Sequence, residues 1–430
     1  MSTRPYSNFA TSILAIVLFM ISGCAQQPTN LTQQSQVKKS APTAPFPLSA
    51  LTSPVPDTAT DQRLASRPDG SLALTWWQTA DEGKTALLVS ELDDGKWSLP
   101  ITISAMPNIV EAQIVTVGDS GLAALWMASK PAKNGEGEVH EIYTTRSNDK
   151  ARKQWAVPLL LNQEAETSMK ESPALAAMPD GTLLSAWIDM RNYKMVPPSK
   201  PGAEATSEGF TSLMVASVSA DNKLGKEMLV DKDFCECCPP SIAANEQGGL
   251  LAYREHKDGN VRDPAVMRIS ANDFGQSTIV NNDHWVIDGC PSKAPAIARM
   301  DKSVSVAWLT TINNKTQIRA AFSNDDGQHF TAPIDLESEH AGGVSGIEME
   351  SPHSALVAWT ITGTQGETTK LVRIYDDGRV EHRTTVHSLS DGKAYKWPGP
   401  RMVKTKDSVI IAWNDEQAKK MGLVKVKVDQ

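Results

Sequence analysis

An alternating run of apolar residues recurs along the chain and ends each time in a small residue followed by an aromatic one. Alternation with a period of two is typical of a β-strand that packs on a core. The seven copies end at Trp76, Trp126, Trp187, Tyr253, Trp308, Trp359 and Trp413. Successive aromatic residues are 50, 61, 66, 55, 51 and 54 positions apart, close to the length of one four-stranded propeller blade. The repeat therefore predicts an all-β fold, a β-propeller of seven four-stranded blades, with six blades as the alternative.

Each copy has a strand pattern before it and another after it, separated by turns such as Pro179-Asp180-Gly181. These are strands A, B and C of a blade, and an outer strand D follows in most blades. After the seventh copy only the run 422–428 remains, so the last blade lacks a strand. The segment 46–53 is free to supply it and to close the ring without an open sheet edge. The repeated aromatic residues are expected to pack between blades.

The first 24 residues have the pattern of a targeting segment. Arg4 precedes an apolar run from Phe9 to Met20 that is too short to span a bilayer as a mature helix. The run ends in Ile21-Ser22-Gly23-Cys24, which resembles a bacterial lipobox, and this resemblance implies a lipid on Cys24. An ordinary signal peptide is the alternative.

The domain organisation follows from this N-terminus. Ala25 resembles the pattern of outer-membrane lipoproteins, which implies a lipid-anchored protein of the cell envelope that faces the periplasm or the exterior. Residues 25–45 are rich in Gln, Ser, Thr and Pro and have too few apolar residues to fold, so they predict a flexible tether. Residues 46–430 are then a single propeller domain.

The charge of the chain argues against one class of partner. The formal net charge is −8, and no Lys/Arg run is longer than a pair. A nucleic-acid-binding protein needs a clustered basic face. We therefore expect no nucleic-acid partner.

One turn carries a family resemblance. The segment Ser323-Asn-Asp325-Asp-Gly327-Gln-His-Phe330 fits the Asp-box (BNR repeat) of the sialidase superfamily, Ser-x-Asp-x-Gly-x-x-aromatic. The resemblance implies that Asp325 and Gly327 stabilise a turn between strands C and D. Such boxes hold turns and carry no chemistry, so they imply a fold and not an activity.

A second resemblance concerns the middle of the chain. The pattern Cys-x-Cys-Cys, Tyr253-Arg254-Glu255, Arg262-Asp263 and Gly-Cys290-Pro is similar to that of a group of uncharacterised bacterial sialidase-like lipoproteins, which usually have Asp in place of Glu255. Sialidases themselves have six blades, three arginines for a substrate carboxylate, an acidic Asp and a Tyr paired with a Glu. This chain departs from them in its seven repeats and in Arg67-Pro68-Asp69, where the family has Arg-Ile-Pro.

The topology of an antiparallel blade sorts these motifs onto one face. The A–B and C–D turns lie on one side of the ring, and the B–C and D–A connections lie on the other. Arg191, Arg254, Arg262 and Asp263 fall on the second side, as does a long loop over 192–208. Arginines there can receive an anionic ligand. Alternatively, Arg254 with Glu255, and Arg262 with Asp263, pair with carboxylates of neighbouring blades and lock the ring.

The same face holds candidates for catalysis. For a glycosidase of the exo-sialidase type, Asp189, Glu255 or Asp415 is the candidate acid and Tyr395 the candidate nucleophile. Glycoside hydrolysis needs two such groups at a fixed separation, and sequence alone does not place them.

Four cysteines also lie in D–A connections of this face, at Cys235, Cys237, Cys238 and Cys290. An even number in an oxidising compartment favours disulfides. A bond between adjacent cysteines is strained, so Cys290 is expected to pair with one of the cluster, and the other two with each other. A four-thiolate site for zinc or copper is the alternative.

Three functions remain open at this point. The first is a lipid-anchored propeller that binds an anionic glycan or peptide on the B–C and D–A face, with an envelope protein as another partner. The second is a sialidase-like glycosidase. The third is an envelope scaffold or a metal-binding protein, and no cofactor is expected unless the thiolates hold zinc or copper.

Overall fold

A computed structural model of the chain describes residues 42–56, 59–80, 83–133, 137–147, 154–163, 168–196, 206–257, 259–395, 399–415 and 420–428. The expected signal segment, Cys24 and most of the expected tether lie outside these residues. No helix among the described residues is long and apolar enough to cross a membrane.

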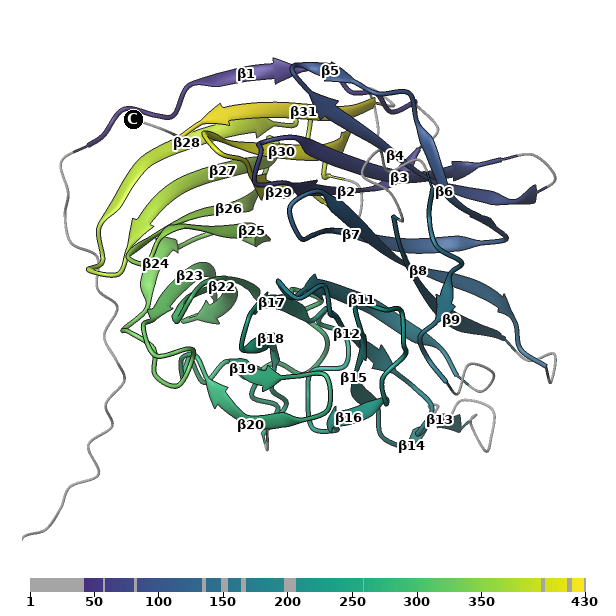
Figure 1. Ribbon diagram of the computed structural model, residues 1–430. Helices are drawn as coiled ribbons and strands as arrows, with labels where there is room; N and C mark the ends of the chain where they lie inside the picture. The colour runs from purple at the N-terminus through teal and green to yellow at the C-terminus, as the bar shows by residue number, and fades with distance from the viewer. Residues whose placement is uncertain are drawn as a thin grey trace, which may run out of the picture. The chain divides into compact units, whose positions relative to one another are not determined.

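Seven antiparallel sheets are arranged around a central channel as the blades of a β-propeller (Figure 1). The innermost strand of every blade, strand A, contacts the innermost strands of both neighbouring blades, so these strands form a closed ring. The prediction of an all-β, seven-bladed propeller is confirmed, and the six-bladed alternative is wrong.

The blades follow the chain, each running from the inner strand A to the outer strand D. In blades 1 to 3 the strands are β2 (Thr60–Ser66), β3 (Leu72–Thr79), β4 (Thr85–Asp93) and β6 (Ile101–Met106); β7 (Ile109–Val117), β8 (Gly121–Pro131), β9 (Glu138–Arg146) and β10 (Leu159–Leu160); β11 (Lys170–Ala177), β12 (Leu183–Asp189), β15 (Ser212–Val218) and β16 (Met228–Asp231). In blades 4 to 6 they are β17 (Ser241–Asn245), β18 (Gly248–Arg254), β19 (Pro264–Ile269) and β20 (Phe274–Ile279); β21 (Ala296–Met300), β22 (Ser303–Ile312), β23 (Lys315–Ser323) and β24 (Ile334–Glu337); β25 (Ala341–Ser351), β26 (Ser354–Gly363), β27 (Gly366–Tyr375) and β28 (Val380–Ser388). Blade 7 consists of β29 (Arg401–Lys404), β30 (Ser408–Asp415), β31 (Lys420–Lys427) and β1 (Leu48–Leu51). Blade 1 also carries the short strand β5 (Lys96–Trp97), which pairs with β4.

The N-terminal strand β1 completes the last blade. It pairs antiparallel with β31, with Leu48 opposite Val426 and Leu51 opposite Leu423. Just before β1, Phe46 is only 2% exposed, and its ring stacks on His382 at a centroid distance of 4.6 Å. The ring of blades is therefore closed by the segment that its strand pattern predicts.

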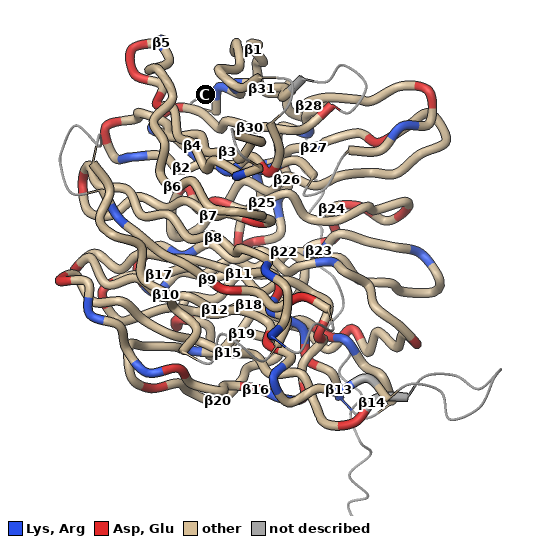
Figure 2. The backbone as a smooth tube through the Cα atoms, turned by 90° about the vertical axis from the view of Figure 1, so that its right-hand side faces the viewer, with Lys and Arg blue, Asp and Glu red and all other residues tan. Residues whose placement is uncertain are grey.

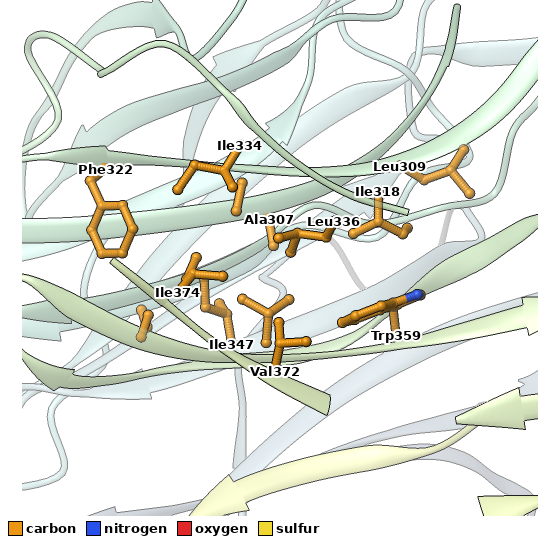
Figure 3. Packing of buried hydrophobic residues seen from close by; sticks show 14 of the residues in the cluster. Ala307, Leu309, Ile318, Phe322, Ile334, Leu336, Ile347, Trp359, Val372 and Ile374 are labelled. Carbon is orange, nitrogen blue, oxygen red and sulfur yellow. The ribbon is translucent and has the colours of Figure 1, made fainter. Parts of the chain in front are cut away.

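The core consists of layers between adjacent blades. The second strands, such as β12 and β18, are buried along their whole length because both faces of the sheet pack on a neighbour. Trp76, Trp126, Trp187, Trp308 and Trp359 are at most 1% exposed, as expected from the repeat. Figure 3 shows one such layer, in which Phe322, Ile334 and Leu336 of blade 5 face Ile347, Trp359 and Ile374 of blade 6.

Side-chain hydrogen bonds hold the turns on one face of the ring. In the A–B turns, Asp69 Oδ1 accepts from the backbone N–H of Ser71, and Asp180 Oδ1 accepts from that of Thr182, both at 2.8 Å. Between β23 and β24, Ser323 Oγ accepts from the N–H of Gly327 at 2.9 Å and donates to Asp325 Oδ1 at 2.8 Å. These residues have structural contacts in turns, far from the B–C and D–A connections.

The long B–C connection of blade 3 differs from the irregular loop expected over 192–208. It contains a two-stranded hairpin of β13 (Tyr193–Val196) and β14 (Thr206–Gly209). Its tip lies outside the described residues. The difference arises because β13 and β14 pair with each other through their backbones. The three prolines of this segment hid that pairing in the sequence.

Several inner strands bulge where they enter the ring. The pairing register shifts between Thr60 and Arg63 in β2 and between Glu171 and Ala174 in β11. Asp61 and Ser172, inside these bulges, have φ values of 56° and 53°, which non-glycine residues rarely adopt. Bulges are common next to functional sites because they re-aim a side chain.

Candidate functional site

The central channel contains a cavity of about 280 Å³ near the end where the D–A connections enter the inner strands. Its polar lining comes from several blades and includes Arg63, Glu111, Ser172 and Arg401. A second pocket of about 230 Å³ adjoins it and shares Pro239, Ala294, Val344, Ser345 and Arg401. The two hollows therefore form one continuous site on the B–C and D–A face.

The outer pocket adds chemically different groups to the site. Lys293 lies in the link between blades 4 and 5, Glu367 lies on β27, and Tyr395 lies in the link to blade 7. Tyr395 Oη accepts from the hydroxyl of Thr369 at 2.9 Å, and its backbone N–H donates to Glu367 at 2.7 Å. Burial raises the pKa of Tyr395 to about 12, so its hydroxyl is protonated at neutral pH.

Two carboxylates share one guanidinium in the channel. Arg63 Nη1 lies 2.6 Å from Asp61 Oδ1, and its Nη2 lies 3.3 Å from Glu111 Oε1. The second oxygen of Asp61 accepts from the backbone N–H of Ala112 at 2.7 Å. The bulge at Asp61 therefore turns a side chain of β2 toward β7 and joins blades 1 and 2.

Burial sets the protonation of this pair. It raises the pKa of Glu111 to about 7, against the attraction of Arg63 and with added repulsion from Asp61. Burial also raises the pKa of Asp61, again against the effect of Arg63. Burial, with repulsion from Asp61, outweighs the attraction of Arg63 and Arg401 and leaves Glu111 partly protonated near neutral pH.

Two cations of the site have no ionic partner in the part of the chain that the structure describes. Arg401 and Lys293 lack both a salt bridge and a side-chain hydrogen bond there. Burial lowers the pKa of Arg401 to about 10, and the neighbouring Arg63 adds to this effect. The positive charges of Arg401 and Lys293 therefore lie beside a pocket and can pair with an anion bound there.

The arginines expected from the sequence do not converge on this site. Arg191 is tied to Asp189 at 2.7 Å and to Glu227 at 2.8 Å within blade 3. Asp189 is fully buried and also accepts from the Trp187 indole at 3.0 Å. Burial acts to raise the pKa of Asp189, but hydrogen bonds from Arg191 and Trp187 outweigh it, and the pKa lies below its ordinary value. This ion pairing lies within one blade, so it differs from the pairing between blades that was the alternative interpretation.

Arg254 is fully buried and serves as a cross-link. Its Nε donates to the Lys293 carbonyl and its Nη1 to the Arg262 carbonyl, each at 2.9 Å, and its Nη2 donates to Leu309. Its guanidinium lies 5.0 Å from the centre of the Trp285 ring. Three carbonyl acceptors leave no donor face of Arg254 directed at either cavity.

Arg262 and Asp263 are buried as well. The Nε and Nη1 of Arg262 have no hydrogen-bond partner among the described residues, and the side chain does not line either cavity. Asp263 accepts from the backbone N–H groups of His284 and Trp285 at 3.1 Å. Asp263 therefore fixes the D–A link between blades 4 and 5.

The catalytic candidates are spread over separate blades. Glu255 accepts from Ser277 at 2.5 Å and lies 3.4 Å from the Tyr253 hydroxyl in a buried part of blade 4. Asp415 ends β30 in blade 7. Of the four predicted candidates, only Tyr395 lines the site.

The cysteines converge as the topology predicts. Cys237 and Cys290 form a disulfide between consecutive D–A links, while Cys235 and Cys238 are buried thiols with their sulfurs 3.4 Å apart. Three sulfurs of the cluster lie within 4.8 Å of one another. Because the disulfide uses two of the four sulfurs, the four-thiolate metal site considered from the sequence is not formed.

Several residues of the site were missed at the level of sequence. Arg63, Glu111 and Arg401 lie on inner strands, whose alternation was interpreted as packing alone. Arg67, which stands where sialidases have Arg-Ile-Pro, lies in an A–B turn on the opposite face and pairs with Glu91 at 3.1 Å. The sequence feature that could have indicated these channel residues is a polar residue near the start of several inner strands.

Comparison with known proteins finds solved structures of low sequence identity. Neither a protein-family model nor a curated protein matches the sequence. Similar solved structures include a mutant of the NanB sialidase from Streptococcus pneumoniae, at 12% identity and a TM-score of 0.41 over 91% of this chain and 70% of that one. An α-L-arabinanase from Penicillium chrysogenum, complexed with arabinobiose, has 11% identity and a TM-score of 0.42 over 91% and 99%.

A protein of unknown function from Dyadobacter fermentans has 13% identity and a TM-score of 0.43 over 86% of this chain and 95% of that one. These likenesses carry no conclusion about activity. The propeller fold itself rests on the strand pairing described above.

Proposed function

We propose that the chain binds an anionic glycan at the mouth of its central channel, on the B–C and D–A face. The observation that carries this proposal is the pair of cations without ionic partners, Arg401 and Lys293, that lines two adjoining hollows. A guanidinium can hold a carboxylate through two parallel hydrogen bonds. Lys293 is exposed and Arg401 is half-buried, so both charges can reach an anion that enters the pocket.

The rest of the lining suits a sugar better than an extended peptide. Thr360, Ser345, Glu367 and the Tyr395 ring surround the outer pocket, and they offer hydrogen-bond donors and acceptors for hydroxyl groups. A peptide bound as an added strand follows one continuous sheet edge. The inner strands are paired on one side only, but the residues that line the outer pocket come from several separate strands and links.

Calorimetric titration of the purified full-length protein tests the proposal. The probes are a uronic-acid oligosaccharide, a sialyl-oligosaccharide and a neutral oligosaccharide of equal length. We expect binding of a charged probe only, and at least a tenfold loss of affinity, about 1.4 kcal/mol, in Arg401→Gln. Arg146→Gln is the matched control, because Arg146 contacts only backbone carbonyls on the opposite face. Equal affinity for neutral and charged probes would refute the proposal.

Glycoside hydrolysis is a second candidate function, favoured by one observation. Asp61 and Glu111 contact the same guanidinium, and the pKa of Glu111 is raised to about 7. A carboxylic acid protonated near neutral pH can act as a general acid, and Glu111 lines the inner cavity. Release of reducing ends from a bound probe, lost in Glu111→Gln with binding retained, is the expected result. Binding without release would leave the chain a binding protein.

Lipid anchoring at Cys24 is part of the same proposal. The lipobox-like segment before Cys24 supports it, as does the polar tether that follows. Cys24→Ser is expected to move the protein from the membrane fraction to the soluble fraction of the producing bacterium. Unchanged membrane association of the variant would count against the anchor.

A further inference from the structure

The cysteine cluster combines a disulfide with two unused thiols at short range. Cys235 Sγ lies 3.4 Å from Cys238 Sγ and 3.7 Å from Cys237 Sγ, the half-buried member of the Cys237–Cys290 disulfide. Thiol–disulfide exchange needs a thiolate next to a disulfide sulfur and an available leaving thiol. Cys290 is the exposed end of this disulfide, so it can leave into solvent.

The surroundings of the two thiols favour a thiolate. Arg254 and Arg262 are buried guanidiniums, and neither has a salt bridge to a carboxylate among the described residues. The hydrogen bond from Cys235 lowers the pKa of Cys238 to about 7, against burial and with help from Arg254. The same bond raises the pKa of Cys235. Cys238 therefore holds the negative charge, and Cys235 keeps a proton directed at it.

We propose that the four cysteines form an internal thiol–disulfide relay, in which Cys235 and Cys238 are the inner couple and Cys237–Cys290 is the outer one. In the first step Cys238 takes the proton of Cys235, and Cys235 attacks the sulfur of Cys237. The Cys237–Cys290 bond breaks, a Cys235–Cys237 bond forms, and Cys290 leaves as a thiolate. One disulfide is lost and one is gained, so no outside oxidant or reductant is needed.

A second exchange completes the relay. Cys238, after it loses its proton to solvent, attacks Cys235, and Cys237 leaves and takes up a proton. The product is a buried Cys235–Cys238 disulfide with two thiols at Cys237 and Cys290. Direct attack of Cys238 on Cys237 would join adjacent residues and strain the intervening peptide, so Cys235 is the entry point.

The relay reaches the proposed ligand pocket through one short link. Cys290, Ser292 and Lys293 lie in the connection between β20 and β21, and Ser292 Oγ is 3.1 Å from Cys290 Sγ. Ser292 and Lys293 also line the outer pocket. Release of Cys290 would free the segment that carries Lys293, so exchange would weaken ligand binding. This consequence rests on the proposed function, whereas the exchange itself does not.

Alkylation of the native, full-length protein without reductant tests the relay. Iodoacetamide is added, the reaction is stopped with acid, and peptides are mapped by mass spectrometry. We expect the label to accumulate on Cys290, together with a new disulfide among residues 235–238. Cys290 can react only after exchange releases it.

The variants separate exchange from simple opening of the fold. Cys235→Ser is expected to slow labelling of Cys290 more than about tenfold, because it removes the attacking thiol. A label on Cys235 or Cys238 with the Cys237–Cys290 bond intact would indicate local unfolding and would overturn the proposal. Equal labelling of Cys290 in the wild type and in Cys235→Ser would overturn it too.

Thermal unfolding of each variant checks that the fold is kept. A folded Cys290→Ser protein that forms a disulfide within 235–238 on mild oxidation gives independent support. These readouts do not depend on any glycan.

Discussion

Arg63 and Arg401 both place a positive charge in the central channel. Among the described residues, only Arg63 forms salt bridges there. Arg63 forms salt bridges with Asp61 and Glu111, whereas Arg401 is attracted to the same two carboxylates without a salt bridge among the described residues. Removal of one partner of a buried ion pair leaves an uncompensated charge, which is strongly destabilising. Arg63 is therefore assigned mainly to stability and Arg401 to ligand binding.

Chemical denaturation of two variants tests this division of roles. Arg63→Gln is expected to lower the free energy of unfolding by about 3 to 5 kcal/mol, since it strands two buried carboxylates. Arg401→Gln is expected to change it by less than about 1 kcal/mol, since no ion pair is broken. If the two variants lose equal stability, Arg401 has a structural partner and its proposed availability is wrong.

Glu111 should make stability depend on pH in a known direction. Its pKa is raised to about 7 from 4.5, so the folded state binds a proton that the unfolded state has already released. The resulting stability is present below pH 4.5 and is lost as pH rises to about 7.

The unfolding free energy of wild type minus that of Glu111→Gln should fall by on the order of 3 kcal/mol across this window. Denaturation at pH 4.5, 6 and 8 measures the difference, and Glu208→Gln on exposed β14 is the control. A difference that grows with pH would show that Glu111 is ionised in the folded state.

The chemistry of individual residues was only partly predictable from the sequence. The cysteines could be predicted to meet because they lie in consecutive D–A links, and topology alone brings those links together. The convergence of Arg191, Arg254 and Arg262 could not be inferred, because side-chain direction decides it. Arg191 turns toward Glu227 and Arg254 turns into backbone carbonyls, contacts that no spacing records.

At the scale of elements, the bulged inner strands shape the mouth of the channel. A bulge shifts the alternation of a strand by one residue and so re-aims its side chains, Asp61 toward β7 of the next blade and Ser172 into the cavity. Asp61 in β2 and Ser172 in β11 occupy such positions with positive φ. The sequence could predict these strands and not their bulges, since neither position is a glycine.

Ser172→Gly should stabilise the propeller. Glycine adopts positive φ without the steric cost borne by other residues, so we expect a gain of about 1 kcal/mol, reduced by the greater freedom of the unfolded chain. Ser345→Gly on β25 is the matched control, because Ser345 also lines the cavity and is absent from the positive-φ positions. The control should lose about 0.5 to 1 kcal/mol. Loss of stability at both positions would mean that the bulge in β11 needs the Ser172 side chain.

At the scale of the whole molecule, acidic and basic residues are scattered along the backbone drawn in Figure 2. Seven near-identical blades could be predicted because the Trp repeat recurs once per blade, and each large aromatic ring fills the space between two sheets. The join between the first and last strands was inferred in the same way, by counting strands. The whole fold was thus more accessible from the sequence than its site.

The buried aromatic side chain of Phe46, at the start of the described chain, anchors the segment that closes the ring of blades. Phe46 packs against His382 and lies 5.2 Å below the Arg373 guanidinium. Phe46→Ala should lower the free energy of unfolding by about 3 kcal/mol and should expose residues 42–53 to protease before the rest of the chain. Phe210→Ala, at a side chain that is 38% exposed, should cost less than about 1 kcal/mol. If residues 42–53 of the Phe46→Ala variant resist protease, β1 holds the ring of blades together without Phe46.

Pairing of β1 with β31 also imposes an order on biosynthesis. Strand β1 stays unpaired until β31, more than 360 residues later, has left the ribosome, while the six blades between them have all their own strands. A chain cut short before β31 leaves an apolar segment without its partner, and proteases can recognise it as unfinished. The ring of blades can therefore close only after both β1 and β31 have been made.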